Sequence, residues 1–156
     1  DELLLLDITA TVEKRPPTFK LLAQVASECF MPVTYGGGIC TLIDMEKILS
    51  LGFEKLSINS YAVENPLFIA EASRTFGSQS IVVSIDVKKK LFGGFEVVSQ
   101  CGQHRTGLDP VLFAKRIPVF ETSTASDSGV FAASAIKPTT FSHSSILTES
   151  LALAAA

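Results

Sequence analysis

The sequence lacks the features that mark membrane, secreted and nucleic-acid-binding proteins. Its longest apolar runs, at residues 3–6 and 151–156, are far shorter than the ~20 residues of a membrane-spanning helix. No secretory signal is visible. The net charge is only -3, which provides no electrostatic attraction toward nucleic acid or an anionic membrane. From these absences we expect a cytoplasmic protein whose partners include neither a membrane nor a nucleic acid.

Cysteine and histidine are also scarce. The three cysteines (Cys29, Cys40 and Cys101) are odd in number and none lies in a C-x-x-C spacing, which favours free thiols in a reducing compartment over disulfides. The two histidines, His104 and His143, have no companions at the spacing of metal ligands. The sequence therefore predicts no metal site, and we expect no cofactor.

What the chain does contain is typical of one globular domain. It has 156 residues, of which 47% are hydrophobic and 19% are charged, and this is enough apolar material for a real core. The chain opens on Asp1 and passes directly into strand-like sequence. On this basis we expect it to be a piece of a longer protein.

Strand-like and helix-like segments alternate through the first half of the chain. Four apolar runs end at Asp7, Gly36, Asn59 and Asp86, at steps of 29, 23 and 27 residues. Each gap carries a helical signal. The first gap has an apolar stripe, formed by Leu22, Val25, Ala26 and Cys29. The second has a pair like a capping box, Thr41 and Asp44, and the third has an Asn-Pro start at Asn65 and Pro66. Repeated strand–helix–strand units with continuous apolar strands predict an α/β fold built on a parallel sheet.

The pattern loosens beyond Asp86. Residues 88–100 contain a Gly-Gly pair between two apolar segments, which predicts a hairpin-like excursion in the loop after the fourth strand. Asp109 and Pro110 then predict the start of another helix, which runs to about Arg116.

The last 40 residues differ in kind from the rest. Ser, Thr and Ala make up 21 of residues 117–156, against four charged residues. No helical or strand period is sustained there. We interpret this segment as an atypical tail, and we favour a shifted reading frame or a misassembled gene over a poorly ordered segment.

Polar residues or glycines follow each of the four predicted strands. In parallel α/β folds the carboxyl ends of the strands form one rim, where active sites gather. The rim residues would be Asp7, Gly36, Gly37, Gly38, Asn59, Ser60 and Asp86. Glycine amides, a serine hydroxyl and nearby helix N-terminal amides suit a phosphate ester. Taken singly, the glycines are equally consistent with a tight turn, and an aspartate with a helix N-cap. The combination is what predicts a site.

Five segments together resemble the cyclase subunit of imidazole glycerol phosphate synthase, from histidine biosynthesis. They are DELLLLDITAT, PVTYGGGI, EKLSINSYAVENP, FGSQSIVVSIDVK and TGLDP, in order and nearly without gaps over residues 1–116. Related phosphate-binding barrels share the GGGI loop, whereas SINSYAVENP followed by FGSQ points to the cyclase. The resemblance implies a parallel (βα)8 TIM barrel of the ribulose-phosphate-binding type, incomplete here, with about strands two to five within residues 1–116.

The resemblance also implies a reaction and a partner. A glutaminase subunit would form a heterodimer with the chain and supply ammonia through the barrel. Ammonia then attacks a phosphoribulosyl-formimino aminoimidazole carboxamide ribonucleotide. The products are imidazole glycerol phosphate and the aminoimidazole carboxamide ribotide.

Rim residues take roles from the same resemblance. Asp86 matches one of two aspartates that carry the acid–base work, and the other would lie on a first strand that this sequence does not contain. Gly38, Asn59 and Ser60, with Gly37 beside them, match one of the family's two phosphate sites. Ser60 replaces the usual Thr and keeps the hydroxyl. The second phosphate site belongs to strands six to eight, which we do not find.

At the opposite rim the resemblance implies a route for ammonia. Glu2 and Lys55 match the charged gate of this route. Thr34 and Ser57 match its channel lining, and Glu54 and Gln79 match the surface that faces the glutaminase. Without the resemblance, the charges near strand starts would be a solvated face. The polar residues within the strands would be hydrogen-bonded core residues.

Two alternatives to the cyclase stay open. One is a paralogue of the same fold that supplies ammonia for amidine formation on a nucleotide sugar in surface-polysaccharide synthesis. The segments ASECFMPVTYGGGI and SQSIVVSIDVKKKLFGGFEVV suit that branch. The other is a non-catalytic, truncated relic.

Overall fold

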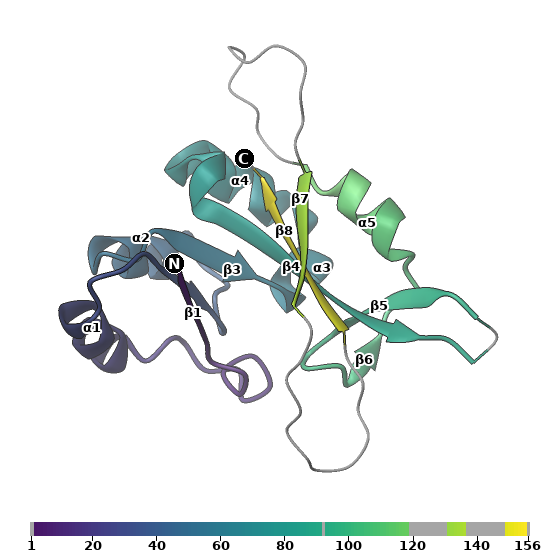
Figure 1. Cartoon of the computed structure of the whole chain (residues 1–156), viewed down its shortest axis with the longest axis horizontal. Helices are drawn as coiled ribbons and strands as arrows, with labels where there is room; N and C mark the ends of the chain where they lie inside the picture. Colours follow the sequence, from purple (N-terminus) through teal and green to yellow (C-terminus); the bar gives the residue numbers. More distant parts are fainter. Residues whose placement is uncertain (1, 92, 119–130, 137–148, 156) are drawn as a thin grey trace.

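A computed structural model describes residues 2–91 and 93–118 in full, together with the backbone of residues 131–136 and 149–155. Figure 1 shows the elements along the chain. They are β1 (Leu3–Leu6), α1 (Phe19–Glu28), β2 (Val33–Gly36), α2 (Leu42–Ser50), β3 (Lys55–Ile58), α3 (Ser60–Glu64), α4 (Pro66–Phe76), the 3-10 turn η1 (Ser78–Ser80), β4 (Ile81–Lys89), β5 (Phe95–Ser99), β6 (His104–Arg105), α5 (Pro110–Arg116), β7 (Phe131–Ile136) and β8 (Glu149–Ala155).

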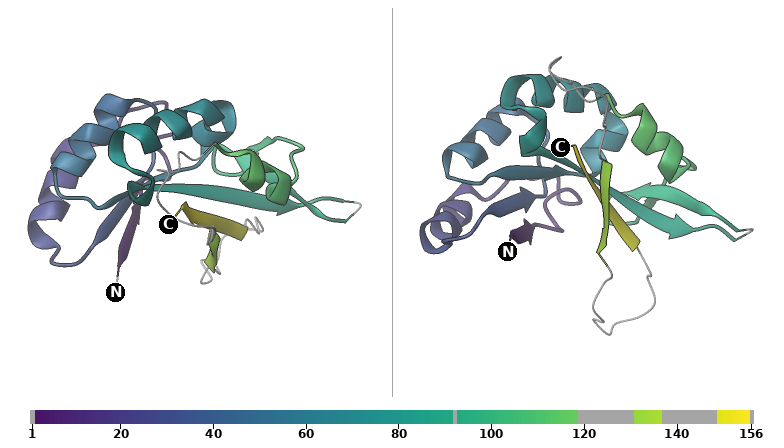
Figure 2. Two further views of the ribbon diagram at one scale, coloured as in Figure 1. Left: turned by 90° about the horizontal axis from the view of Figure 1, so that it is seen from above. Right: turned by 45° about the horizontal axis from the view of Figure 1, so that its top comes forward.

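Four strands form the parallel sheet that the sequence predicts. Strands β1, β2, β3 and β4 pair in that order, and every one of these pairings is parallel. The helices that connect them lie together on one face of the sheet (Figure 2). A curled parallel sheet covered by its crossover helices on one side is part of a (βα)8 barrel. The incomplete TIM-barrel fold is therefore confirmed.

Alternation along the strands separates an apolar face from a more polar one. Residues such as Tyr35, Leu56 and Ile85 lie under the helices, where they form the core with Met45 and Ile48 of α2. The residues between them point to the opposite face, because successive side chains of a strand alternate. On β2 and β3 this opposite face carries hydroxyl-bearing residues.

The helices begin at all three predicted start signals, and in two of them the predicted residue caps the helix with its side chain. Thr41 accepts the Asp44 N–H at the start of α2, and Asp109 accepts the Leu112 N–H at the start of α5. Asn65 precedes α4 as predicted, but its side chain makes no capping hydrogen bond. The five-residue helix α3, directly before Asn65, was not predicted. It is too short to show a helical period.

Strand β4 is longer than the sequence indicates. We expected the strand to end at Asp86, but β4 continues to Lys89. The reason is a change of partner: residues up to Val83 pair in parallel with β3, and Asp86–Lys89 pair antiparallel with β5. The predicted hairpin is therefore confirmed, and Asp86 lies within β4 where the hairpin begins.

The tail contains two strands that the sequence analysis did not predict. Strands β7 and β8 pair antiparallel with each other, and β8 pairs antiparallel with β4 from Val82 to Val87. The unpaired backbone groups along that edge of β4 give a strand of small residues a template for pairing, whatever its side-chain period. His143 lies outside the described residues. The interpretation of residues 117–156 as a frame-shifted or misassembled tail stays a prediction.

The other end of the sheet is open. Strand β1 pairs only with β2 among the described residues, and its side chains Leu4 and Leu6 are 37% and 51% exposed. In the described part of the chain, no helix is long and apolar enough to cross a membrane.

Candidate functional site

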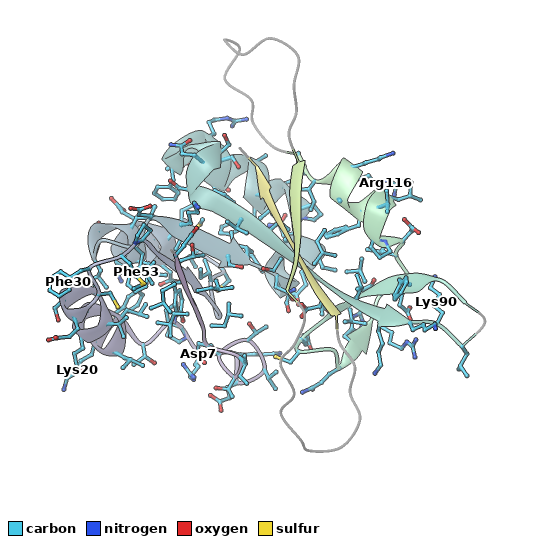
Figure 3. The ribbon with its side chains drawn as sticks, in the orientation of Figure 1. Asp7, Lys20, Phe30, Phe53, Lys90 and Arg116 are labelled. Atoms are coloured by element: carbon cyan, nitrogen blue, oxygen red, sulfur yellow. The ribbon has the colours of Figure 1, made fainter. Side chains whose placement is uncertain are left out.

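Asp7 is fixed by the loop that follows β1 (Figure 3). Arg15 binds its carboxylate with two nitrogens, at 2.8 and 2.9 Å, and the Ala10 N–H donates to it over 3.2 Å. Burial disfavours the charged carboxylate, but Arg15 and the Ala10 N–H outweigh burial and hold the pKa of Asp7 below its ordinary value. Asp7 therefore shapes the β1–α1 loop as a carboxylate that is charged at neutral pH. No pattern in the sequence indicates Arg15 as the partner of Asp7.

The glycines after β2 are required by this loop. Gly37 and Gly38 have φ angles of 126° and 66°, which side chains rarely allow. A Cβ at Gly37 would lie 2.3 Å from the Asp7 carbonyl oxygen, and one at Gly38 would lie 2.7 Å from that of Arg15. The Gly38 N–H donates to Thr11 Oγ1 over a long 3.4 Å. Close approach of two loops explains the glycines, and the weakly held Gly38 N–H leaves a donor that an anion could take.

Asn59 and Ser60 come together at the next strand end. Gly36 of β2 pairs with Ser57 of β3, so the loops that contain Gly38 and Asn59 leave the sheet at the same level. Asn59 Nδ2 donates to the Ser84 carbonyl oxygen over 3.0 Å, and Ser60 Oγ donates to Asn59 Oδ1 over 3.1 Å. Ser60 is only 6% exposed. The two predicted phosphate residues thus form one hydrogen-bonded unit at the carboxyl rim.

Asp86 lies on the same face of the sheet as two serines. Ser84 and Asp86 are two residues apart on β4, so both side chains point to the side away from the helices. Ser57 of β3 reaches the same face, because its Oγ lies 2.6 Å from Ser84 Oγ. Asp86 is half-buried, and its charge adds to the effect of burial in raising the pKa of the Cys101 thiol. A carboxylate in this position can exchange a proton with a molecule held at the rim.

A charged cluster lies at the opposite rim. Lys55 Nζ contacts both carboxylate oxygens of Glu2, at 3.2 and 3.1 Å, and Thr34 Oγ1 donates to Glu2 over 2.6 Å. Thr34 is buried at 4% exposure, whereas Glu54 and Gln79 are exposed at this end of the sheet. The structure therefore brings the two predicted gate residues into an ion pair and attaches one predicted channel residue to it.

The charge state of Glu2 depends on these contacts. The Thr34 hydroxyl, and then Lys55, lower the pKa of Glu2 below its ordinary value of 4.5. The stabilisation that results is present above that ordinary value and is lost as the pH falls through the lowered pKa.

We expect Thr34→Val, which removes the hydroxyl and keeps the shape, to raise the pKa of Glu2, as followed by NMR titration of the glutamate carboxyl carbons. Thr75→Val on α4, where the hydroxyl bonds within its own helix, is the control. An unchanged Glu2 titration in Thr34→Val would contradict the assignment.

Sequence reasoning missed several residues that hold the site together. Ser84 joins Ser57 and Asn59, and its only signal in the sequence is its position two residues before Asp86. Gln100 donates its backbone N–H to Ser60 Oγ although the two residues lie 40 apart in the sequence, and no local sequence pattern indicates this contact. Among the described residues, no three His, Cys, Asp or Glu side chains converge in a way that could hold a metal ion.

One comparison with known proteins bears on the whole arrangement. The model of the family described as "Histidine biosynthesis protein" matches residues 1–124. The match includes β1 to β6, α5 and every residue of both rims described above. The chain belongs to this histidine biosynthesis family of TIM-barrel proteins.

Proposed function

We propose that the chain is the central part of the cyclase subunit of imidazole glycerol phosphate synthase. The observation that carries the proposal is a succession of polar groups along the face of the sheet opposite the helices. It begins at the Glu2–Lys55 pair, continues at Thr34 on β2 and the hydrogen-bonded Ser57 and Ser84 on β3 and β4, and ends at Asp86. On this face of the sheet, hydroxyl groups can accept and donate hydrogen bonds to ammonia between the two rims.

The proposed role of the charged rim is to admit ammonia from the glutaminase. The Glu2–Lys55 pair is partly exposed, with side-chain exposures of 42% and 35%, so its two partners can separate at a modest free-energy cost. Glu54 and Gln79 are exposed at this end of the sheet and would face the glutaminase. Ammonia released there would meet Thr34 and Ser57 next along the sheet.

The proposed role of the carboxyl rim is to bind the ribonucleotide and to transfer protons during the reaction. Gly37, Gly38, Asn59 and Ser60 would hold one phosphate of the ribonucleotide and so fix the position of the reacting end. Asp86 would take a proton from the attacking nitrogen as the new C–N bond forms. It would return that proton to the nitrogen of the departing aminoimidazole carboxamide ribotide as the C–N bond that joins this group to the rest of the substrate breaks. Positioned acid–base groups of this kind typically contribute ~10²–10⁴-fold to a rate.

The phosphate half-site can be tested by binding alone. We expect Ser60→Ala to weaken the binding of inorganic phosphate to the 156-residue chain, because the variant loses the hydroxyl donor. A hydrogen bond to a charged group contributes roughly 1.5–3 kcal/mol, which corresponds to roughly 10- to 150-fold in affinity. NMR chemical shifts of the amides at residues 36–40 and 59–62, followed during a phosphate titration, measure this.

Ser50→Ala is the matched control, because Ser50 lies on α2 and its hydroxyl bonds to its own helix. Phosphate-dependent shifts confined to residues 36–40 and 59–62 would support the half-site. Equal affinities of Ser60→Ala and Ser50→Ala, or the absence of shifts in the unsubstituted chain, would rule it out.

A further inference from the structure

The turn between β5 and β6, residues 100–103, is held by parts of the fold outside its own hairpin. The Gln100 N–H donates to Ser60 Oγ over 2.8 Å, and its side-chain amide donates to Glu64 of α3 over 3.4 Å. The Cys101 thiol donates to the Ile8 carbonyl oxygen over 2.8 Å. The turn therefore bridges α3 and the β1–α1 loop, which both border the carboxyl rim.

The backbone of this turn is unusual. Gln100 and Cys101 have φ angles of 52° and 56°, in the left-handed region that residues with a side chain seldom adopt. Such conformations persist where the surroundings fix them, and they gather at functional sites. Here the contacts to Ser60 and Ile8 supply that fixation. One of these two strained residues, Gln100, donates its backbone N–H to the hydroxyl of Ser60.

The hydrogen bonds at Ser60 have a definite direction. A serine hydroxyl has one proton to donate, and its lone pairs can accept. Ser60 donates its proton to Asn59, whereas the bond from Gln100 uses a lone pair. Ser60 can therefore turn its proton from Asn59 to an anion while it keeps the bond from Gln100. A hydroxyl that accepts one hydrogen bond is a stronger donor in the next, because chained hydrogen bonds polarise one another.

We propose that the Gln100 backbone N–H is a positioning group of the phosphate half-site, which orients and polarises the Ser60 hydroxyl toward a bound phosphate. The bond from Cys101 to Ile8 holds the turn in the position that this requires. The inference rests on the proposed function, since it needs a phosphate at Ser60. Burial raises the pKa of the Cys101 thiol, so the proton needed for the bond to Ile8 is retained at neutral pH.

The test uses the 156-residue chain and inorganic phosphate. We expect phosphate to slow hydrogen exchange of the Gln100 amide. Cys101→Ala, which releases the turn from Ile8, should weaken phosphate binding by about 2- to 10-fold, because a thiol is a weak donor and its loss costs at most what one ordinary hydrogen bond contributes. Cys101→Ser keeps a donor and should restore the affinity. Gln103→Ala changes an exposed residue of the same turn whose side chain makes no hydrogen bond to any described residue, and should bind phosphate normally.

A second comparison separates positioning from a general structural effect. If the turn acts through the Ser60 hydroxyl, Cys101→Ala should cause no further loss of affinity in a Ser60→Ala background. An equal loss in both backgrounds, or normal binding by Cys101→Ala, would overturn the inference and leave the phosphate half-site standing. If the unsubstituted chain binds no phosphate, the half-site and this inference fall together. If Cys101→Ala does not fold, the exchange rate of the Gln100 amide with and without phosphate decides the question.

Discussion

Ammonia-dependent turnover of the imidazole precursor is expected to fall by ~10²–10⁴-fold when Asp86 is replaced by Asn in a complete barrel. The amide keeps the size of the carboxylate but cannot take up the proton that the attacking nitrogen releases. The four parallel strands described here are half of an eight-stranded barrel, so the 156-residue chain alone is expected to be inactive. Reacting groups misplaced by about 1 Å cost a further ~10²-fold, and a bisphosphate substrate that is held at one end only permits such errors.

The experiment compares the 156-residue chain with a chimaera in which a cyclase barrel of the same family supplies the remaining strands. Each is assayed with ammonia in excess, with and without Asp86→Asn. Asp109→Asn is the matched control, because Asp109 caps α5 and asparagine caps helices equally well. Turnover by the isolated chain, or a chimaera indifferent to Asp86→Asn, would remove Asp86 from the proposed mechanism.

Gly37→Ala is expected to cause the largest loss of stability of any single methyl added to the rim. The φ angle of 126° is strained for alanine, and the new Cβ would lie 2.3 Å from the Asp7 carbonyl oxygen, a backbone atom that cannot rotate away. Backbone strain of this kind costs of order 1–3 kcal/mol, and forced overlap typically costs a further ~1–3 kcal/mol. We therefore expect a fall of about 2–6 kcal/mol in the free energy of unfolding, measured by urea denaturation.

Gly52→Ala is the control that isolates the two causes. Gly52 also has a positive φ, 101°, but a Cβ there would meet nothing within 4 Å. That variant should lose only the contribution of backbone strain, of order 1–3 kcal/mol. Equal losses in Gly37→Ala and Gly52→Ala would show that the β1–α1 loop does not lie close enough to Gly37 to exclude a methyl group.

The parallel sheet was predictable because each of its strands carries apolar residues at the positions that face the helices. Val83 and Ile85 are buried against helices, and Leu56 lies in the same core, so hydrophobicity marks each strand. The end of β4 was not predictable in this way, because beyond Asp86 the strand is held by main-chain pairing with β5. Main-chain hydrogen bonds form whatever the side chains are, so residues such as Lys88 and Lys89 show no hydrophobic period that would indicate a strand.

The site was predictable to the extent that it follows strand ends. Asn59 and Ser60 lie on the rim because parallel strands place their carboxyl ends together. Asp86 lies within β4, at the point where its parallel pairing with β3 has ended and its pairing with β5 begins. The contacts between loops carry no comparable signal. Arg15 reaches Asp7 only because the β1–α1 loop folds back on itself, and Gln100 reaches Ser60 through a turn of unusual backbone conformation. Only the structure shows such partners.

The change of partner along β4 also has a consequence for the order of folding. Lys89 and Phe95 lie close in the sequence and pair directly, so this pairing closes a short loop and is expected within microseconds. Leu3 and Val33 are separated by a whole helical crossover, and closing such a loop costs more chain entropy before any contact forms. We therefore expect the hairpin to nucleate and the β1 edge to join last. During that interval the leucines of β1 are open to other chains, and the yield of refolded protein should fall as its concentration rises.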